Sequence, residues 1–299
     1  MFLLLMFYSI VASVFTFGKQ LTCYAAPFFA IGVRLAPGGI IFLAYFYCFE
    51  RKNFAFKSSY IPLIVGYALT AFGMDIFRLI SLRYVPASNA ALIFCTGPLI
   101  AAFFSWLFLR EQFDKHQILA LIIGVIGMLP LLMADSKIGS IDNTITLIAY
   151  CGILLSTLSK VLCGIISKLL VEEQECPLSF CLGWGMLIGG IVSFIGSLLF
   201  EPWNPVPVYN LKPALELMTF LFFTHTLIAY PLYSYLVTQY TVTLVTFGQL
   251  SVPFIAAILT YLFYGQPIGI PFFISLVILS GSFWLFYKEE LYLLSKGRK

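Results

Sequence analysis

The sequence predicts an all-α membrane protein with ten transmembrane helices, and two observations carry this prediction. Hydrophobic residues make up 61% of the 299 residues and charged residues only 10%, whereas soluble domains carry about 25% charged residues. Apolar stretches of about 20 residues, the length that crosses a bilayer as a helix, recur along the whole chain. No single core could bury this much apolar sequence in water, so lipid is the expected solvent.

Short connections with proline, glycine or charged residues separate the stretches, and none is long enough to hold a soluble domain. The first stretch lacks the basic n-region and the cleavage site of a signal peptide, and it is therefore interpreted as a spanning helix. The predicted helices are Phe2–Cys23, Pro27–Cys48, Ser59–Leu82, Ala87–Leu109, His116–Met133, Thr144–Leu169, Leu178–Phe200, Pro213–Leu236, Thr241–Tyr264 and Ile268–Tyr287.

Basic residues in the connections predict the orientation, because cytoplasmic loops are enriched in lysine and arginine. With a cytoplasmic N-terminus, the outside segments carry only Arg83, Lys137 and Lys212. The inside segments carry Arg51, Lys52, Lys57, Arg110, Lys115, Lys168, Lys288, Lys296, Arg298 and Lys299. Both termini are therefore predicted to be cytoplasmic.

Composition excludes several functions. No basic run with interleaved aromatic residues is present, so no nucleic acid partner is expected. The seven cysteines have no CxxC spacing and the chain has two histidines, so neither a disulfide framework nor a metal site is predicted. The sequence contains no phosphate-binding GxxxxGK[ST] loop and no HExxH zinc helix. We expect no cofactor and no catalytic residues, and transport driven by a gradient or by exchange.

An internal repeat appears at an offset of 155 residues (253 − 98). It aligns the stretch that ends at Glu111 with the stretch that ends at Gln266. The offset places Pro98 on Pro253, Ala101 and Ala102 on Ala256 and Ala257, Trp106 on Tyr261, Leu107 and Phe108 on Leu262 and Phe263, and Glu111 on Gln266. This predicts two halves, 1–138 and 139–299. Five helices per half is an odd number, so the halves would be inverted, as in alternating-access transporters. The alternative is that apolar helices resemble one another by composition alone.

The stretch from Ser81 to Met133 resembles the EamA domain of the drug/metabolite transporter superfamily. The matching elements are Ala87–Ala91, Pro98 in mid-helix, Glu111 at the helix end and Gly124-x-x-Gly127, with Lys19, Pro27 and Arg34 earlier in the chain. The resemblance implies a ten-helix, two-repeat fold with cytoplasmic termini. It also implies transport of amino acids, nucleosides, sugars or related small metabolites.

The chain departs from that family pattern at two positions. The acid of the first half is Gln266 in the second half, and the counterpart of Arg34 is apolar, near Trp184. The halves therefore do not present equivalent charges. A coupling scheme that needs an acid in each half is doubtful.

Ionisable residues inside a bilayer are costly and are candidates for function. Asp75 and Arg78 are three residues apart and share a helix face, and Arg34 is expected at similar depth. The functional interpretation is a site where arginine binds a carboxylate and Asp75 binds an amine or a ribose hydroxyl. The alternative is an Arg34–Asp75 pair that locks two helices.

The offset of 155 also places Asp75 on Tyr230 and Arg78 on Tyr233. A charged pair would then face a tyrosine pair, which suits a ligand with a polar head and a planar part. Scattered polar residues of the fourth and ninth helices, including Asn89 and Gln249, either line the same cavity or join helices.

Three further ionisable residues have two interpretations each. Lys19, His225 and Glu216 are candidates for a proton or charge relay. The alternatives are snorkelling for Lys19, a buried hydrogen-bonded histidine for His225 and surface exposure for Glu216. Lys160 is placed toward the cytoplasmic side, and snorkelling to the surface explains it.

The sequence thus favours a secondary transporter or exchanger of the bacterial inner membrane that moves a small polar or zwitterionic metabolite. An amino acid or a nucleoside conjugate such as S-adenosylmethionine fits the mixed charges and aromatic residues. Expected partners are the small-molecule substrate and the lipid bilayer, and a homodimer stays open. The rival hypotheses are a membrane-embedded enzyme using Asp75, Glu216 and His225, and a non-transporting scaffold with a sealed interior. Asp75→Asn is expected to reduce uptake without reducing folded yield.

Overall fold

The computed structural model describes residues 2–51, 54, 57–101, 104, 115–127, 129–130, 143–239, 249, 251–265 and 268–295. Those ranges contain helices and short connections but no β-strand, only an isolated antiparallel bridge between Ala25 and Val208. The prediction of an all-α fold is confirmed. Glu111, Gln266 and Trp106 lie outside the described residues.

The described helices follow the predicted stretches closely. Because apolar runs in lipid must satisfy every backbone hydrogen bond internally, helix bounds can be predicted from hydropathy. The helices are α1 (Phe2–Leu21), α2 (Pro27–Tyr45), α3 (Tyr60–Leu82), α4 (Ala87–Phe94), α6 (Lys115–Ile126), α8 (Asn143–Lys168), α9 (Leu178–Phe200), α10 (Leu211–Leu221), α11 (Tyr230–Gln239), α13 (Ser251–Tyr264) and α14 (Ile270–Ser295), with π-helical segments η1 (Phe46–Glu50), η3 (Leu169–Glu173) and η4 (Phe222–Ala229).

Five helical segments in the described ranges are long and apolar enough to cross a membrane. They are Pro27–Glu50, Tyr60–Leu82, Thr144–Val171, Leu178–Phe200 and Leu211–Leu236. Large apolar side chains point outward from such helices, as at the end of α9, where Leu199 is 71% and Phe200 74% exposed. Charged side chains are instead buried in the interior, as Arg34 and Asp75 are. This inside-out distribution is typical of a protein surrounded by lipid.

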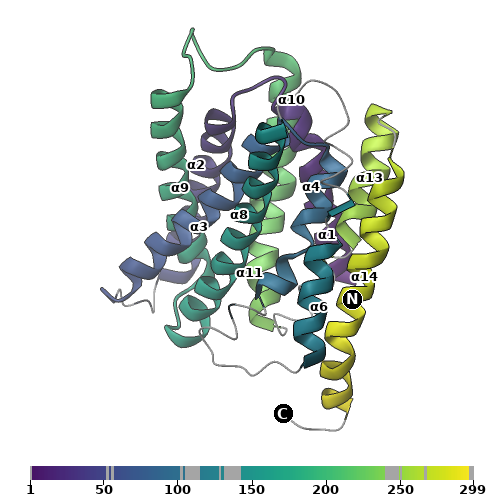
Figure 1. Ribbon diagram of the computed structural model, residues 1–299. Coiled ribbons are helices and arrows are strands. Elements are labelled where there is room, and N and C mark those ends of the chain that lie inside the picture. The colour runs from purple at the N-terminus through teal and green to yellow at the C-terminus, as the bar shows by residue number, and fades with distance from the viewer. Residues whose placement is uncertain are drawn as a thin grey trace.

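The helices pack as a bundle in which neighbours come from distant parts of the chain. α2 packs along α9, α3 against α8, α6 against α14, and α13 contacts both α1 and α4. In the view of Figure 1, α2 and α9 form one edge of the bundle and α13 and α14 the opposite edge. α1, α8 and α11 lie between these edges. The buried charges come from both regions: Arg34 lies on α2, Asp75 and Arg78 lie on α3, and Lys160 lies on α8.

α2 and α9 approach each other closely because glycines line their contact. A Cβ atom added to Gly39 would lie 2.6 Å from the backbone nitrogen of Leu187, and one added to Gly190 would lie 2.6 Å from that of Ala36. Neither position could hold a side chain without separating the helices. Small residues are what lets helix backbones meet in a membrane.

Two of the predicted helices are interrupted in the structure. The eighth stretch consists of α10, the π-helical η4 and α11, although its sequence predicts a single spanning helix. The fourth stretch is helical over Ala87–Ala101, with a turn at Cys95 and Thr96. Pro98 explains the second break, because proline has no N–H to donate to the carbonyl four residues earlier, that of Phe94.

Candidate functional site

The site is centred on an ion network between α2 and α3. Arg34 Nη2 on α2 lies 2.7 Å from Asp75 Oδ2 on α3. Arg78, one helical turn beyond Asp75, pairs with the other carboxylate oxygen. All three side chains are 1% exposed. The predicted common face of Asp75 and Arg78 is present, and so is the Arg34–Asp75 pair, which was the alternative interpretation of these charges.

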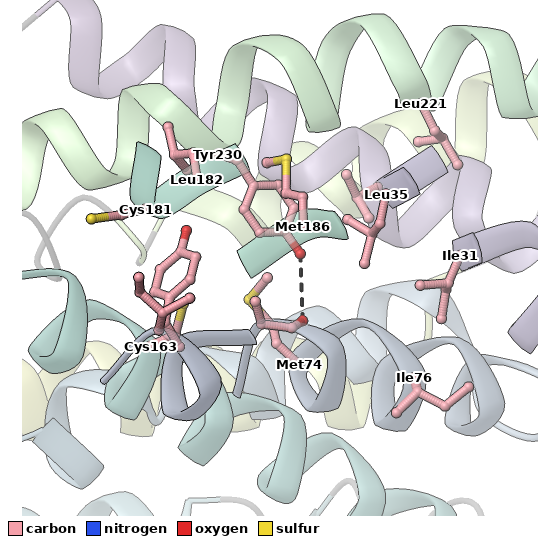
Figure 2. Close-up of a cluster of buried hydrophobic side chains, with 14 of the residues drawn as sticks. Ile31, Leu35, Met74, Ile76, Cys163, Cys181, Leu182, Met186, Leu221 and Tyr230 are labelled. Carbon is pink, nitrogen blue, oxygen red and sulfur yellow. Dashed lines mark hydrogen bonds between the residues drawn. The ribbon is translucent and has the colours of Figure 1, made fainter. Parts of the chain in front are cut away.

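Tyr230, at the start of α11, completes the network from the other side. Its hydroxyl donates to Asp75 Oδ2 at 3.1 Å and also lies 3.4 Å from the carbonyl oxygen of Ala71. Figure 2 shows this hydroxyl directed toward the helix that carries Met74. The two residues related by the offset of 155 thus touch each other. Asp75 is held by donors from α2, α3 and α11.

Several buried nitrogen atoms of the described interior nevertheless have no hydrogen-bond partner. Within the described ranges, no hydrogen-bond partner is present for Arg34 Nε and Nη1, Arg78 Nε, Lys160 Nζ or His225 Nδ1, and all these atoms are buried. Arg34 and Arg78 therefore share the carboxylate of Asp75, and Lys160 is a third buried cation, which no ion pair in the described residues joins to a carboxylate. Buried polar groups are almost always paired, so these unpaired donors favour a ligand that brings an anionic group.

A small cavity of about 30 Å³ lies beside these donors. Arg78, Lys160 and His225 line it together with the rings of Tyr230 and Tyr233. Further lining comes from Phe7, Val11, Met74, Phe94, Cys163 and Ala229. This volume holds about two water molecules, whereas pockets for metabolites measure about 300–1,000 Å³. The site is therefore closed in this conformation and must widen to admit a metabolite.

Lys160 corrects the prediction that it snorkels to the surface. It lies in the middle of α8, is 5% exposed, and lines the cavity. Its Nζ lies 4.5 Å from the ring centre of Phe94, 5.3 Å from that of Tyr233 and 5.7 Å from that of Tyr8. The position of Lys160 along its predicted helix indicated only the cytoplasmic side of the membrane. Its aromatic neighbours come from three other helices, and no local sequence pattern connects them to Lys160.

Asn89 and Gln249 are buried, but neither lines the cavity. Asn89 Nδ2 donates to the hydroxyl of Tyr150 at 3.3 Å. Gln249 Nε2 donates at 2.9 Å to the carbonyl oxygen of Phe94, the acceptor that Pro98 leaves without its helical donor. In these contacts both side chains join helices, which was the alternative interpretation of the polar stripes.

The three relay candidates lie in different environments. Lys19 Nζ donates to the carbonyl oxygens of Leu82 at 2.9 Å and Val85 at 2.6 Å, so it stabilises the end of α3. Glu216 is exposed on α10. His225, on η4, is the one of the three that lines the cavity, where its ring meets the edge of the Tyr230 ring at 5.1 Å.

A larger cleft of about 490 Å³ lies away from this network. Aromatic and aliphatic side chains dominate its lining, with Arg51 as the charged member. The lining residues are Phe46, Tyr47, Arg51, Phe54, Ile61, Ile64, Val65, Phe180, Trp184 and Ile188. The cleft is open on one side and contains none of the buried unpaired donors. We therefore place the candidate site at the small charged cavity.

Comparison with known proteins identifies the family. A model of the EamA-like transporter family matches residues 1–133 and again residues 147–288. The chain belongs to the EamA-like transporter family. This membership confirms the resemblance found in the sequence and makes the protein a multi-pass membrane protein. It also confirms the expectation of a transporter rather than an enzyme, because the family is one of transporters.

Curated relatives of this EamA-like chain agree with that assignment. It is 25% identical over 283 residues to the S-adenosylmethionine/S-adenosylhomocysteine transporter of Chlamydia trachomatis serovar L2, covering 93% of this chain and 86% of the relative. It is 26% identical over 290 residues to the transporter of the same description from Chlamydia muridarum, with 93% and 88% covered. A solved crystal structure matches 94% of each chain with a TM-score of 0.66 at 18% identity, which shows that the fold is shared.

Proposed function

We propose that the protein exchanges S-adenosylmethionine for S-adenosylhomocysteine across the bacterial inner membrane. The observation that carries the proposal is the buried cavity in which unpaired cationic donors and aromatic rings meet, beside the carboxylate of Asp75, which two of the lining residues contact. Both metabolites have an amino acid head with one carboxylate and one amine, and both have a planar adenine. The names of the chlamydial relatives add support from an independent direction.

The residues around the cavity supply a partner for each part of such a ligand. Arg78 and Lys160 line the cavity and carry unpaired donors for the carboxylate. Asp75 lies directly behind Arg78 and Tyr230 of the cavity wall, and in the widened cavity it accepts from the amine. Phe7 and Tyr233 stack with ring centres 5.8 Å apart, and they offer aromatic faces for the adenine. Arg34 does not line the cavity, so its proposed role is to hold the carboxylate of Asp75.

Exchange follows from the chemistry of the two metabolites. They differ by one methyl group and by the positive charge on the sulfur. One site can therefore bind both metabolites. The concentration gradient of one metabolite then drives the transport of the other, and no ion gradient is needed. An alternating-access mechanism, in which the cavity opens to one side at a time, fits the closed conformation of the cavity.

We further propose ten spanning helices in two inverted repeats, 1–138 and 139–299, with both termini cytoplasmic. Two hydrogen bonds join residues 155 positions apart, Asp75 with Tyr230 and Phe94 with Gln249. Contacts between positions related by the repeat offset are expected along the axis of a pseudo-twofold arrangement. The separate family matches to 1–133 and 147–288 also favour duplication.

Transport in liposomes tests the proposal. Purified protein is reconstituted, the vesicles are loaded with unlabelled S-adenosylhomocysteine, and uptake of labelled S-adenosylmethionine is measured. We expect rapid uptake that depends on the internal metabolite and persists without a proton gradient. The matched control is Lys212→Met, a basic side chain exposed on α10, which should transport as the wild type does. Absence of exchange, with uptake of other amino acids or nucleosides instead, would refute the substrate assignment.

A further inference from the structure

The Nζ atom of Lys160 lies in a cage of three aromatic rings. Phe94 from α4, Tyr233 from α11 and Tyr8 from α1 place their ring centres 4.5, 5.3 and 5.7 Å from this atom. Each distance is within the range of about 6 Å at which a cation is attracted to a ring face. Tyr8 is 1% and Phe94 1% exposed, so the cage is closed off from solvent. We call these three rings the aromatic cage.

The contacts of Lys160 Nζ are unusual for a buried lysine. Among the residues described by the structure, the atom has no hydrogen-bond acceptor, and no salt bridge joins it to a carboxylate. A buried charge normally has such a partner. The three rings of the aromatic cage are therefore the groups that stabilise the Lys160 ammonium in this structure. The cage is attached to the cavity, since Phe94, Tyr233 and Lys160 all line it.

A cage of aromatic rings is selective for a kind of cation that cannot donate hydrogen bonds. Quaternary ammonium groups are recognised in this way, because ring faces attract charge without needing a donor. A methylated sulfonium has the same properties: it carries a positive charge, it is surrounded by carbon, and it has no N–H or O–H. A thioether has the same shape and no charge.

From this we infer that the aromatic cage is the subsite for the sulfonium of the substrate and that the Lys160 ammonium is its tethered competitor. The inference rests on the proposed function and names the group that distinguishes the two metabolites. In the closed conformation, Lys160 occupies the cage. A sulfonium displaces it from the rings, and in either complex the ammonium remains available to the carboxylate of the ligand.

Competition by Lys160 sets the relative affinity for the two metabolites. The sulfonium of S-adenosylmethionine gains the rings but must displace Lys160, whereas the thioether of S-adenosylhomocysteine leaves Lys160 in the cage. The affinities for the two metabolites are therefore more similar than they would be if the rings acted without Lys160. An exchanger benefits from this, because a site that held one metabolite far more tightly would release it slowly.

Binding of both metabolites to purified variants tests the inference. In Lys160→Met the cage is open to the sulfonium, and we expect the ratio of S-adenosylmethionine to S-adenosylhomocysteine affinity to rise about tenfold. A contact between Lys160 and the carboxylate contributes equally to both affinities, because both ligands carry that carboxylate, so it cancels in the ratio. In Lys160→Met/Phe94→Leu the closest ring is lost, and the ratio should fall back toward that of the wild type. Lys168→Met, at the end of the same helix, is the matched control and should leave the ratio unchanged.

Other outcomes separate the two proposals. If both metabolites bind but Lys160→Met leaves the ratio within twofold of the wild-type value, or lowers it, the cage is not the sulfonium subsite and the proposed function stands. If the wild type binds neither metabolite, the proposed function fails, and the sulfonium assignment fails with it. If Lys160→Met does not fold, Lys160→Gln gives the same comparison with a neutral polar side chain.

Discussion

Side chains from three helices contact the carboxylate of Asp75. Two of them form ion pairs with it, and the third donates a hydrogen bond. Arg34 comes from α2, Arg78 from α3 and Tyr230 from α11. Each of these side chains is buried, so each pairing is made where water does not compete. Loss of the carboxylate would leave two guanidinium groups buried without a counter-charge. Asp75 therefore has a structural role as well as the proposed role in binding the substrate amine.

The variant Asp75→Asn should lose both stability and transport. Removal of one member of a buried ion pair typically costs about 3–5 kcal/mol, and here one carboxylate serves two arginines. We expect a lower thermal unfolding midpoint in detergent and no exchange in liposomes. This revises the expectation from the sequence that folded yield would be unaffected. Tyr230→Phe removes a hydroxyl but no charge, and it should cause a smaller loss; an Asp75→Asn variant as stable as the wild type would contradict this account.

At the residue scale, the sequence predicted the network but not the whole cavity. Charges inside apolar stretches are costly, so Arg34, Asp75 and Arg78 could be found by inspection. The offset of 155 then selected Tyr230, which does contact Asp75. Lys160 could not be placed in the same way, because its ring contacts come from α1, α4 and α11 and no repeat or spacing relates them to it.

At the scale of elements, two hydrogen bonds join the end of α4 to Gln249, two residues before α13 begins, and a proline stands four residues after each carbonyl acceptor. Pro98 leaves the carbonyl of Phe94 without its helical donor, and Gln249 Nε2 donates to it at 2.9 Å. Pro253 does the same to the carbonyl of Gln249, which lies 2.9 Å from Cys95 Sγ. Each of the two segments thus receives a side-chain donor from the other. The two prolines lie at matching positions, and each carbonyl that lacks a donor from a proline is paired with a side chain of the other segment.

The variant Gln249→Leu should destabilise the protein through the carbonyl of Phe94. A buried acceptor left without a donor costs about 1–3 kcal/mol, and thermal unfolding in detergent measures the loss. In the double variant Pro98→Ala/Gln249→Leu, residue 98 regains an N–H that can donate to that carbonyl. We expect the double variant to recover part of the lost stability. A double variant no more stable than Gln249→Leu alone would show that the carbonyl is not the cause.

The positions of the described helices could be predicted because lipid leaves the chain few alternatives to a helix. Leu178–Phe200, for example, is bounded as predicted. The interruption at η4 (Phe222–Ala229) was not predicted, although Pro231 has no N–H to donate to the carbonyl of Leu227 within it and so signals a change of geometry. This segment carries His225, and π-helical turns occur frequently at functional sites.

At the scale of the whole molecule, α2 and α9 behave as one unit. Glycines bring their backbones together, and side chains join their ends. At one end, Glu201 accepts from the backbone N–H groups of Phe28 and Phe29 at 2.7 and 2.9 Å. At the other end, Ser179 donates to the carboxylate of Glu50. Opening of the central cavity is therefore expected to involve motion of the remaining helices relative to this pair.

The proposed topology predicts opposite exposure of two native cysteines. Cys23 follows the first spanning helix and Cys48 lies at the end of the second, and both are exposed. A helix of 20 residues is about 30 Å long, so consecutive helix ends lie on opposite sides of the bilayer. In single-cysteine variants, a membrane-impermeant maleimide should label Cys23 in intact cells and Cys48 only after permeabilisation. The reverse pattern would place both termini outside.

The contact between Asp75 and Tyr230 has a consequence for the history of the chain. An ancestor with two identical halves would have faced aspartate with aspartate, or tyrosine with tyrosine, across the same point. Two carboxylates at hydrogen-bonding distance cannot both stay ionised, and two tyrosines offer no counter-charge to Arg34 and Arg78. Under the proposed duplication, the present pairing requires that the two copies diverged at this position. Loss of symmetry at the proposed axis would then have allowed one set of buried charges to serve an asymmetric ligand.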